Sequence, residues 1–129
     1  MDSSLMMNIV LIVAVVWFFY RRFASVKGLR NLDGEAFARE LQSEGDKIVI
    51  DVREPFEYSN GFIPGAVNIP LSELPGKLQD APPDRPVYLY CQSGIRSRHA
   101  ARILAARGFS NIAHLAGGLR SWKGPLRRP

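Results

Sequence analysis

The sequence predicts an α/β domain built on a mainly parallel sheet and preceded by one transmembrane helix. Short β-branched or apolar runs alternate with amphipathic segments between residues 32 and 124, which is typical of strands and helices around a parallel sheet. A nearly continuous apolar run stands before them. The 129 residues, 47% of them hydrophobic, suffice for one domain with an appendage. We therefore divide the chain into an anchor, a juxtamembrane linker, a folded domain and a basic tail, at residues 1–23, 24–31, 32–124 and 125–129.

The apolar run extends from Leu5 to Tyr20, and Asn8 is its only polar residue. As a helix it would span about 24 Å, slightly less than a hydrocarbon core of ~30 Å, and flanking Ser3-Ser4 and Arg21-Arg22 could cover the difference. A cleaved signal peptide would carry its positive charge before the run rather than after it. A buried core helix would show a polar face. The run therefore predicts a membrane anchor.

The charges around this run predict its orientation. Arg21, Arg22, Lys27 and Arg30 follow it, whereas only Asp2 precedes it. The positive-inside rule then gives a single-pass protein of the inner (cytoplasmic) membrane, with the domain facing the cytoplasm. The same four cations would lie near anionic headgroups. We interpret the net charge of +5 as a solvated basic surface, and we expect no nucleic-acid partner because no such motif is present.

The domain is expected to begin with a helix over residues 33–44. Asp33 is a suitable N-cap, Phe37 and Leu41 share one face, and Gly45 would end the helix. Residues 47–52 form a β-branched run that predicts a buried strand.

Asp51 and Arg53 lie near the end of this strand, and we interpret them as a structural ion pair in preference to site residues. Pro55 at the start of residues 54–59 predicts a helical turn. The middle of the domain is then assigned to a turn, a short strand, a helical segment broken by Pro75-Gly76 and a proline-rich loop, at residues 63–65, 66–69, 71–78 and 80–86.

The second half of the domain repeats the pattern of strand and helix. Residues 87–90 predict a buried strand that ends at Cys91, and residues 97–107 predict a helix that Gly108 ends. A last strand over residues 112–115 leads to a short helix that opens at Gly117-Gly118, with Trp122 packed on the core.

Cys91 therefore lies where a strand ends and a helix is about to begin. Sites in parallel sheets lie at the carboxyl ends of strands. Backbone N–H groups in such a turn, the helix dipole and the charge of Arg96 would stabilise a thiolate, the reactive form of cysteine. The alternative is that Cys91 is a small buried hydrophobe.

The remaining cysteine and histidine chemistry is limited. Cys91 is the only cysteine, so neither an intrachain disulfide nor a resolving cysteine is available. His99 and His114 are the only histidines, and with one cysteine they do not predict a metal site. We expect His99 to border the Cys91 loop and His114 to be a packed or edge residue.

Four segments can be compared with a known family. Residues 91–97 read Cys-Gln-Ser-Gly-Ile-Arg-Ser, residues 50–58 read Ile-Asp-Val-Arg-Glu-Pro-Phe-Glu-Tyr, residues 61–70 read Gly-Phe-Ile-Pro-Gly-Ala-Val-Asn-Ile-Pro, and residues 115–122 read Leu-Ala-Gly-Gly-Leu-Arg-Ser-Trp. The first resembles the active-site loop of the rhodanese-like sulfurtransferases, the next two their first signature and the last their closing signature. The resemblance extends from about Leu32 to Gly124. It departs at Phe62, where the family often has His, and this concerns local packing rather than the Cys91 loop.

The resemblance implies the rhodanese fold, a five-stranded parallel sheet flanked by helices, and sulfur transfer without a metal or an organic cofactor. In that scheme the Cys91 thiolate attacks a small anionic sulfur donor such as thiosulfate and becomes a persulfide. A thiol, a protein acceptor or cyanide then removes the outer sulfur. The donor would be bound by the residues that follow Cys91, namely Gln92, Ser93, Gly94, Ile95, Arg96 and Ser97.

Two other functions remain open from the sequence. A cysteine-dependent phosphatase uses a similar ring of amides and an arginine, but its loop has one residue more between Cys and Arg than Gln92 to Ile95 supply here. The chain could also be an inactive membrane-tethered binding module. Arg96 could brace the fold by pairing with Glu57 or Asp51, and whether Asp51, Arg53 or Glu57 contributes to the site is left open.

Overall fold

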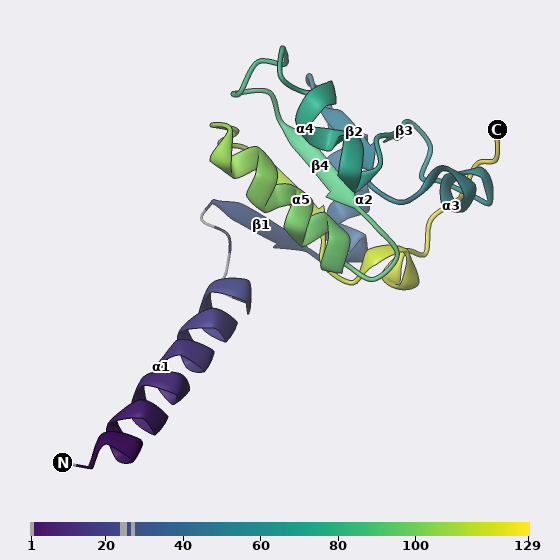
Figure 1. The fold of residues 1–129 in the computed structure, drawn as a ribbon. Helices are drawn as coiled ribbons and strands as arrows, with labels where there is room; N and C mark the ends of the chain where they lie inside the picture. The colour runs from purple at the N-terminus through teal and green to yellow at the C-terminus, as the bar shows by residue number, and fades with distance from the viewer. Residues whose placement is uncertain (1, 24–25, 27) are drawn as a thin grey trace.

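The computed structural model describes residues 2–23, 26 and 28–129 (Figure 1). Within these residues, five parallel strands form one sheet in the order β1-β5-β4-β2-β3. The strands are β1 (Leu29–Leu32), β2 (Ile48–Asp51), β3 (Val67–Asn68), β4 (Val87–Tyr90) and β5 (Ile112–Leu115). This confirms the predicted fold class, a five-stranded parallel sheet with flanking helices. Because the strands are parallel, their carboxyl ends lie along one edge, and Cys91 directly follows the central strand β4.

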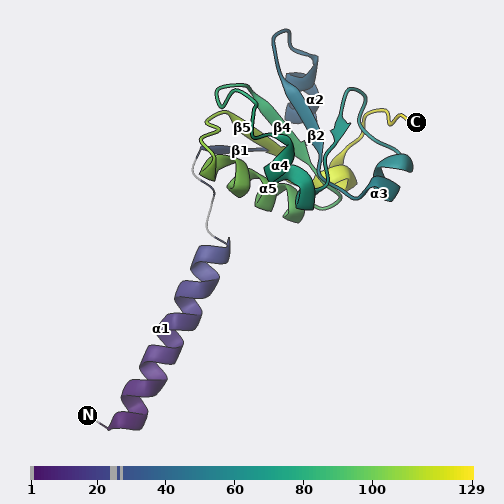
Figure 2. The same ribbon diagram turned by 45° about the horizontal axis from the view of Figure 1, so that its top comes forward.

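Helices cover both faces of the sheet. On one face, α4 (Leu74–Lys77) and α5 (Ile95–Ala106) bury an aliphatic core against β4, in which Leu74, Leu104 and Leu89 are fully enclosed. Figure 2 shows α4 and α5 side by side there. On the other face, α2 (Gly34–Gln42) and η2 (Gly118–Ser121) pack on an aromatic core around Phe37 and Tyr90.

The predicted local signals are present at several element ends. Asp33 caps α2, since its Oδ1 accepts the Ala36 N–H at 2.8 Å, and α2 ends at Gln42, earlier than Gly45. Pro55 opens α3 (Pro55–Ser59) behind a capping box formed by Glu54 and Glu57. Such reciprocal caps satisfy N–H groups that have no partner inside the helix.

The helical segment at residues 71–78 is continuous through Pro75. It consists of a short 3-10 helix, η1 (Leu71–Glu73), followed by α4, in which Pro75 lies in the first turn. Proline is tolerated there because the first-turn N–H groups have no partner inside the helix. The helix is therefore not broken at Pro75-Gly76, and it changes from a 3-10 to an α-helix just before, between Glu73 and Leu74.

Three further boundaries differ from the sequence prediction. Residues 29–31, assigned to the linker, belong to β1, whose residues pair in register with residues 112–115 of β5. This edge strand is short and half polar, so its sequence lacks the apolar run of a central strand. Residues 24, 25 and 27 of the linker lie outside the described residues. The helix predicted from Ser97 begins at Ile95, which puts Arg96 in its first turn.

The third difference concerns the C-terminal tail. Arg127 and Phe62 exchange backbone hydrogen bonds, with N···O distances of 2.9 and 2.8 Å, so the segment predicted as a basic tail is tied to the domain. Phe62 itself is buried and stacks on Tyr58, with ring centroids 4.1 Å apart. An aromatic stack thus fills the position where the family often has histidine.

The N-terminal helix α1 (Ser3–Phe23) is apolar all round, and none of its apolar window is buried against other described residues. Its length and composition fit a membrane span, and they equally fit a signal sequence near the N-terminus. Arg21 lies over the Trp17 ring, 5.1 Å from its centroid. Among the cations predicted to face lipid, Arg30 instead lies in β1 and pairs with Glu40 at 2.8 Å, whereas Lys27 lies outside the described residues.

Candidate active site

The site is built around Cys91, which is fully buried at the carboxyl end of β4. The chain turns sharply after it, and Gly94 adopts a positive φ of 98° immediately before α5 begins. A side chain at Gly94 would be strained by this backbone and would also overlap the Ala116 carbonyl. The turn therefore depends on glycine, and it folds the start of α5 back over the sulfur.

Backbone N–H groups point at the Cys91 sulfur. The N–H of Gly94 lies 3.0 Å from Sγ and that of Ser97 lies 3.4 Å from it. The hydroxyl oxygen of Ser97 is 3.6 Å from the same sulfur. N–H donors at a helix N-terminus favour negative charge, so this arrangement can hold a thiolate or a persulfide anion.

The closing Gly117-Gly118 segment supports the loop from the other side. The Leu119 N–H donates to the Cys91 carbonyl at 3.0 Å, and the Arg120 N–H donates to the Gln92 carbonyl at 3.4 Å. Gly118 has a φ of 65°, and a Cβ there would overlap the Gln92–Ser93 peptide. The loop and η2 therefore fit together only because this position is glycine.

Arg96 is held by a carboxylate. Its Nη1 and Nη2 donate to the two oxygens of Glu57 at 2.7 and 3.0 Å, a bidentate pair in which about a third of the Arg96 side chain is exposed. Hydrogen bonding from Arg96 lowers the pKa of Glu57. Hydrogen bonding to Glu57 raises the pKa of Arg96, and attraction to Cys91 adds a smaller contribution in the same direction. The Glu57 pairing considered from the sequence is thus present.

Asp51 and Arg53 form the structural ion pair that the sequence favoured. Arg53 Nη2 donates to Asp51 at 2.7 Å and to the Gly61 carbonyl at 2.7 Å, and both side chains are almost fully buried. Although burial opposes it, hydrogen bonding to Asp51 raises the pKa of Arg53. The pair holds the segment before Phe62 against the end of β2.

His114 lies in a buried polar chain that the sequence did not predict. Its Nδ1 is 2.8 Å from the Ser97 hydroxyl, and its Nε2 is 2.8 Å from Oδ1 of Asn31 in β1. Burial lowers the pKa of His114 to about 4, and the positive charge of Arg98 acts in the same direction. The imidazole is therefore neutral at neutral pH. No local sequence motif predicts these hydrogen bonds, because the residues that form them come from β1, α5 and β5.

A cavity of about 470 Å³ adjoins the loop and brings Ser93, Gly94 and Ile95 together with α5 and with Ala116. Arg98, His99 and Arg102 line its α5 side, so His99 borders the loop as expected. Ile95 is 78% exposed at its rim. The cavity would present positive charge and the apolar side chains of Ile95 and Ala116 to a molecule that approaches the loop.

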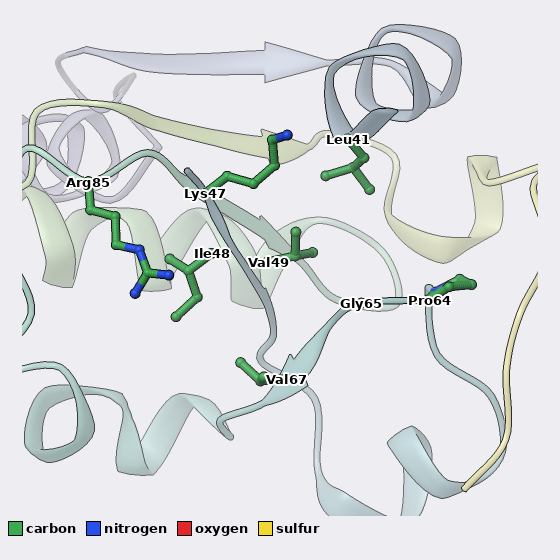
Figure 3. A pocket seen from close by; sticks show the side chains of 8 residues that line it. All are labelled: Leu41, Lys47, Ile48, Val49, Pro64, Gly65, Val67 and Arg85. Atoms are coloured by element: carbon green, nitrogen blue, oxygen red, sulfur yellow. The ribbon is translucent and has the colours of Figure 1, made fainter. Parts of the chain in front are cut away.

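A second cavity of about 420 Å³ lies elsewhere (Figure 3). Lys47 and Ile48 at the start of β2 line it, together with Arg85, which precedes β4. These residues lie at the opposite ends of the strands from Cys91, so this cavity is separate from the loop. Across residues 2–23, 26 and 28–129, no three His, Cys, Asp or Glu side chains gather where they could hold a metal.

Comparison with known proteins gives consistent matches. The family profile described as the rhodanese-like domain matches residues 35–125. The chain is 47% identical to the protein YqhL of Bacillus subtilis over 79 residues, which cover 61% of this chain and 63% of YqhL. It is 33% identical over 94 residues to a sulfurtransferase of Allochromatium vinosum, which covers 73% of this chain and 88% of that protein.

A solved structure gives the same result for the fold. The crystal structure of a rhodanese-related protein from Thermoplasma volcanium superposes with a TM-score of 0.67 at 33% identity, and the match covers 76% of this chain and 97% of that one. The match to YqhL spans slightly less than two thirds of that relative's length. The family profile begins at residue 35, so α1 lies before the matched region.

Proposed function

Because the chain belongs to the rhodanese-like family, we propose that it is a membrane-anchored sulfurtransferase that carries sulfane sulfur as a persulfide on Cys91. One observation carries the proposal: Cys91 follows the central strand β4, and the Gly94 and Ser97 N–H groups lie 3.0 and 3.4 Å from its sulfur. A relative named sulfurtransferase, 33% identical over 94 residues, supports the same class of reaction.

The reaction has two half-steps. In the first, the Cys91 thiolate attacks the outer sulfur of thiosulfate; a new S–S bond forms, the S–S bond of the donor breaks, and sulfite leaves with the electron pair. In the second, a thiol, a protein acceptor or cyanide attacks the outer sulfur of the persulfide, and the Cys91 thiolate is the leaving group. Both steps are nucleophilic displacements at sulfur that need no external oxidant or reductant. Donors at fixed positions stabilise the charge on sulfur in each step.

The residues from Gln92 to Ser97 would bind the anionic donor, and Arg96 would supply the positive charge. Its guanidinium is held at the surface of the loop by Glu57, with about a third of the side chain exposed. An incoming dianion would share or replace the Glu57 contact, because a planar guanidinium can present its N–H groups to either anion. Glu57 then acts as a competing carboxylate that positions Arg96 between turnovers.

Intact-mass analysis tests the covalent step. Thiosulfate treatment of the wild-type protein should add the mass of one sulfur atom, and Cys91→Ser should lose both the added mass and the thiosulfate–cyanide activity. Ser110→Ala, at a surface position remote from the loop, serves as the matched control. Sulfur transfer by a wild-type protein whose mass never changes would refute the covalent scheme.

We also propose that α1 anchors the domain in the inner membrane, with the domain, now beginning at Leu29, on the cytoplasmic side. The support is the apolar, unburied surface of α1 and the arginines that follow Tyr20. The protein should stay in the membrane after alkaline carbonate extraction, and external protease should leave the domain intact in sealed cells. Release by carbonate would disprove the span, and digestion of the domain would disprove the orientation.

A further inference from the structure

The Cys91 thiol has a buried route for its proton. Cys91 is fully enclosed, so its sulfur is not open to bulk solvent. The Ser97 hydroxyl lies 3.6 Å from Sγ and 2.8 Å from Nδ1 of His114. Ser97 is itself fully buried, and His114 is 1% exposed. A continuous line of polar atoms therefore joins the thiol to the imidazole.

The direction of the hydrogen bonds follows from the far end of this line. Oδ1 of Asn31 can only accept, so Nε2 of His114, 2.8 Å away, carries the ring proton. Nδ1 is then the acceptor and receives the Ser97 O–H, which lies closer to it than to the Gly94 carbonyl at 3.2 Å. The oxygen of Ser97 remains free to accept the Cys91 S–H. In this state every group points from sulfur toward the imidazole.

We propose that His114 accepts the proton of the Cys91 thiol through the Ser97 hydroxyl and so prepares the thiolate for the first half-step. The S–H bond breaks, and its proton moves to Ser97 Oγ while the Ser97 proton moves to Nδ1 of His114. Sulfur keeps the electron pair, and His114 becomes an imidazolium whose Nε2–H still donates to Asn31. His114 acts through Ser97, so it is a positioning residue rather than a group that touches the donor. This inference rests on the proposed function for the fate of the thiolate.

The charges around the imidazole are consistent with this role. Burial, and with it the charge of Arg98 on α5, keeps the imidazole neutral at neutral pH, so Nδ1 is free to accept a proton, but both effects disfavour the imidazolium that results. Cys91, through Ser97, provides the compensating negative charge once the proton has moved. On β1, Asn31 is uncharged, and Arg30 beside it pairs with Glu40 on the other face of the sheet.

The two half-steps separate this role from a structural one. The thiol must lose its proton before it attacks thiosulfate, whereas the persulfide enzyme has already lost it. His114→Gln should therefore lower kcat/KM for thiosulfate about tenfold or more at pH 7 and move the rising limb of its pH profile to higher pH. It should leave kcat/KM for cyanide unchanged. Ser110→Ala, at an exposed position remote from the loop, should alter neither constant.

A second variant should move the profile the other way. Asn31→Asp places a carboxylate against Nε2–H, which stabilises the imidazolium, so the rising limb for thiosulfate should move to lower pH. A merely structural role predicts no such opposite displacement. A parallel loss of both kcat/KM values in His114→Gln, or an unmoved pH profile in either variant, would overturn the relay.

Alkylation of Cys91 provides a readout that does not depend on sulfur transfer. Cys91 is the only cysteine, so the rate of iodoacetamide incorporation into the full-length protein in micelles reports it alone. The pH dependence of this rate should shift in His114→Gln and not in Ser110→Ala. An alkylation shift without thiosulfate activity would retain the relay and reject the proposed function, whereas activity without a shift would do the reverse.

Discussion

The buried imidazole of His114 should make the folded protein sensitive to acid between pH 6.5 and pH 4. Burial lowers the pKa of His114 to about 4 in the folded protein, whereas a free histidine has a pKa of about 6.5. Between these values the unfolded chain binds a proton that the folded protein does not, so the free energy of unfolding falls as the pH falls. At 1.36 kcal/mol for each pKa unit, the loss at pH 4 is about 3 kcal/mol.

Comparison with His114→Gln isolates this contribution, because glutamine does not titrate and the carboxylates titrate in both proteins. Urea unfolding in nonionic micelles can be followed by the fluorescence of Trp122, with Trp17→Phe in both backgrounds to remove the signal from α1. The difference in unfolding free energy between the two proteins should change by about 3 kcal/mol from pH 7 to pH 4, with the wild type losing more.

The control for this comparison is the exposed histidine, His99. His99→Gln removes an exposed imidazole, so it measures what loss of a histidine outside the core does. A free-energy difference between wild type and His114→Gln that stays constant from pH 7 to pH 4 would refute the argument. His114 would then be protonated in the folded protein as readily as in the unfolded chain.

Three further perturbations test the rest of the site. Arg96→Ala should lower kcat/KM for thiosulfate about 30- to 1,000-fold, and Arg96→Lys should restore part of it. Glu57→Gln should lower the KM for thiosulfate about fivefold, because it removes a carboxylate that competes for Arg96. Equal losses with charged and neutral donors, together with a lowered melting temperature, would instead make Arg96 a structural residue. Gly118→Ala should lower the melting temperature and abolish the persulfide mass increase, because its Cβ would overlap the Gln92–Ser93 peptide. The control is Gly65→Ala, at a φ of 90° with open space around it, which measures the strain of a positive φ without any overlap. Arg53→Met should lower the unfolding free energy by about 3–5 kcal/mol because it leaves the Asp51 carboxylate buried without its partner, and recovery in the double variant with Asp51→Asn checks this cause by urea unfolding.

Local patterns were sufficient for most elements of the fold. The strand over residues 87–90 and the strand over residues 112–115 are found where apolar runs placed them, and Pro55 and Asp33 open their helices as predicted. Each of these signals acts over a few residues, through side-chain burial, a fixed proline φ or a cap hydrogen bond. The position of Cys91 after the central strand followed from the same local information.

The sequence did not indicate β1 or the bridge between Phe62 and Arg127. Both are held by backbone hydrogen bonds to a partner distant in the sequence, and a backbone pair needs no apolar pattern in the residues that form it. β1 is an edge strand that pairs only with β5, so its own side chains remain half exposed and carry little signal.

The candidate site also combines residues that the local sequence predicts with contacts that only the tertiary structure reveals. The sequence by itself determined the candidate nucleophile, the glycine of its loop and the arginine beside it, because these residues lie within a few positions of one another and their chemistry depends on a local turn. Only the tertiary structure decided what surrounds them: that Arg96 is held by Glu57, that Asp51 is occupied by Arg53, and that Ser97 connects Cys91 to His114. Those contacts join α3, α5, β2 and β5 across the parallel sheet, and their distances are fixed by strand order and register, which no single segment of the chain encodes.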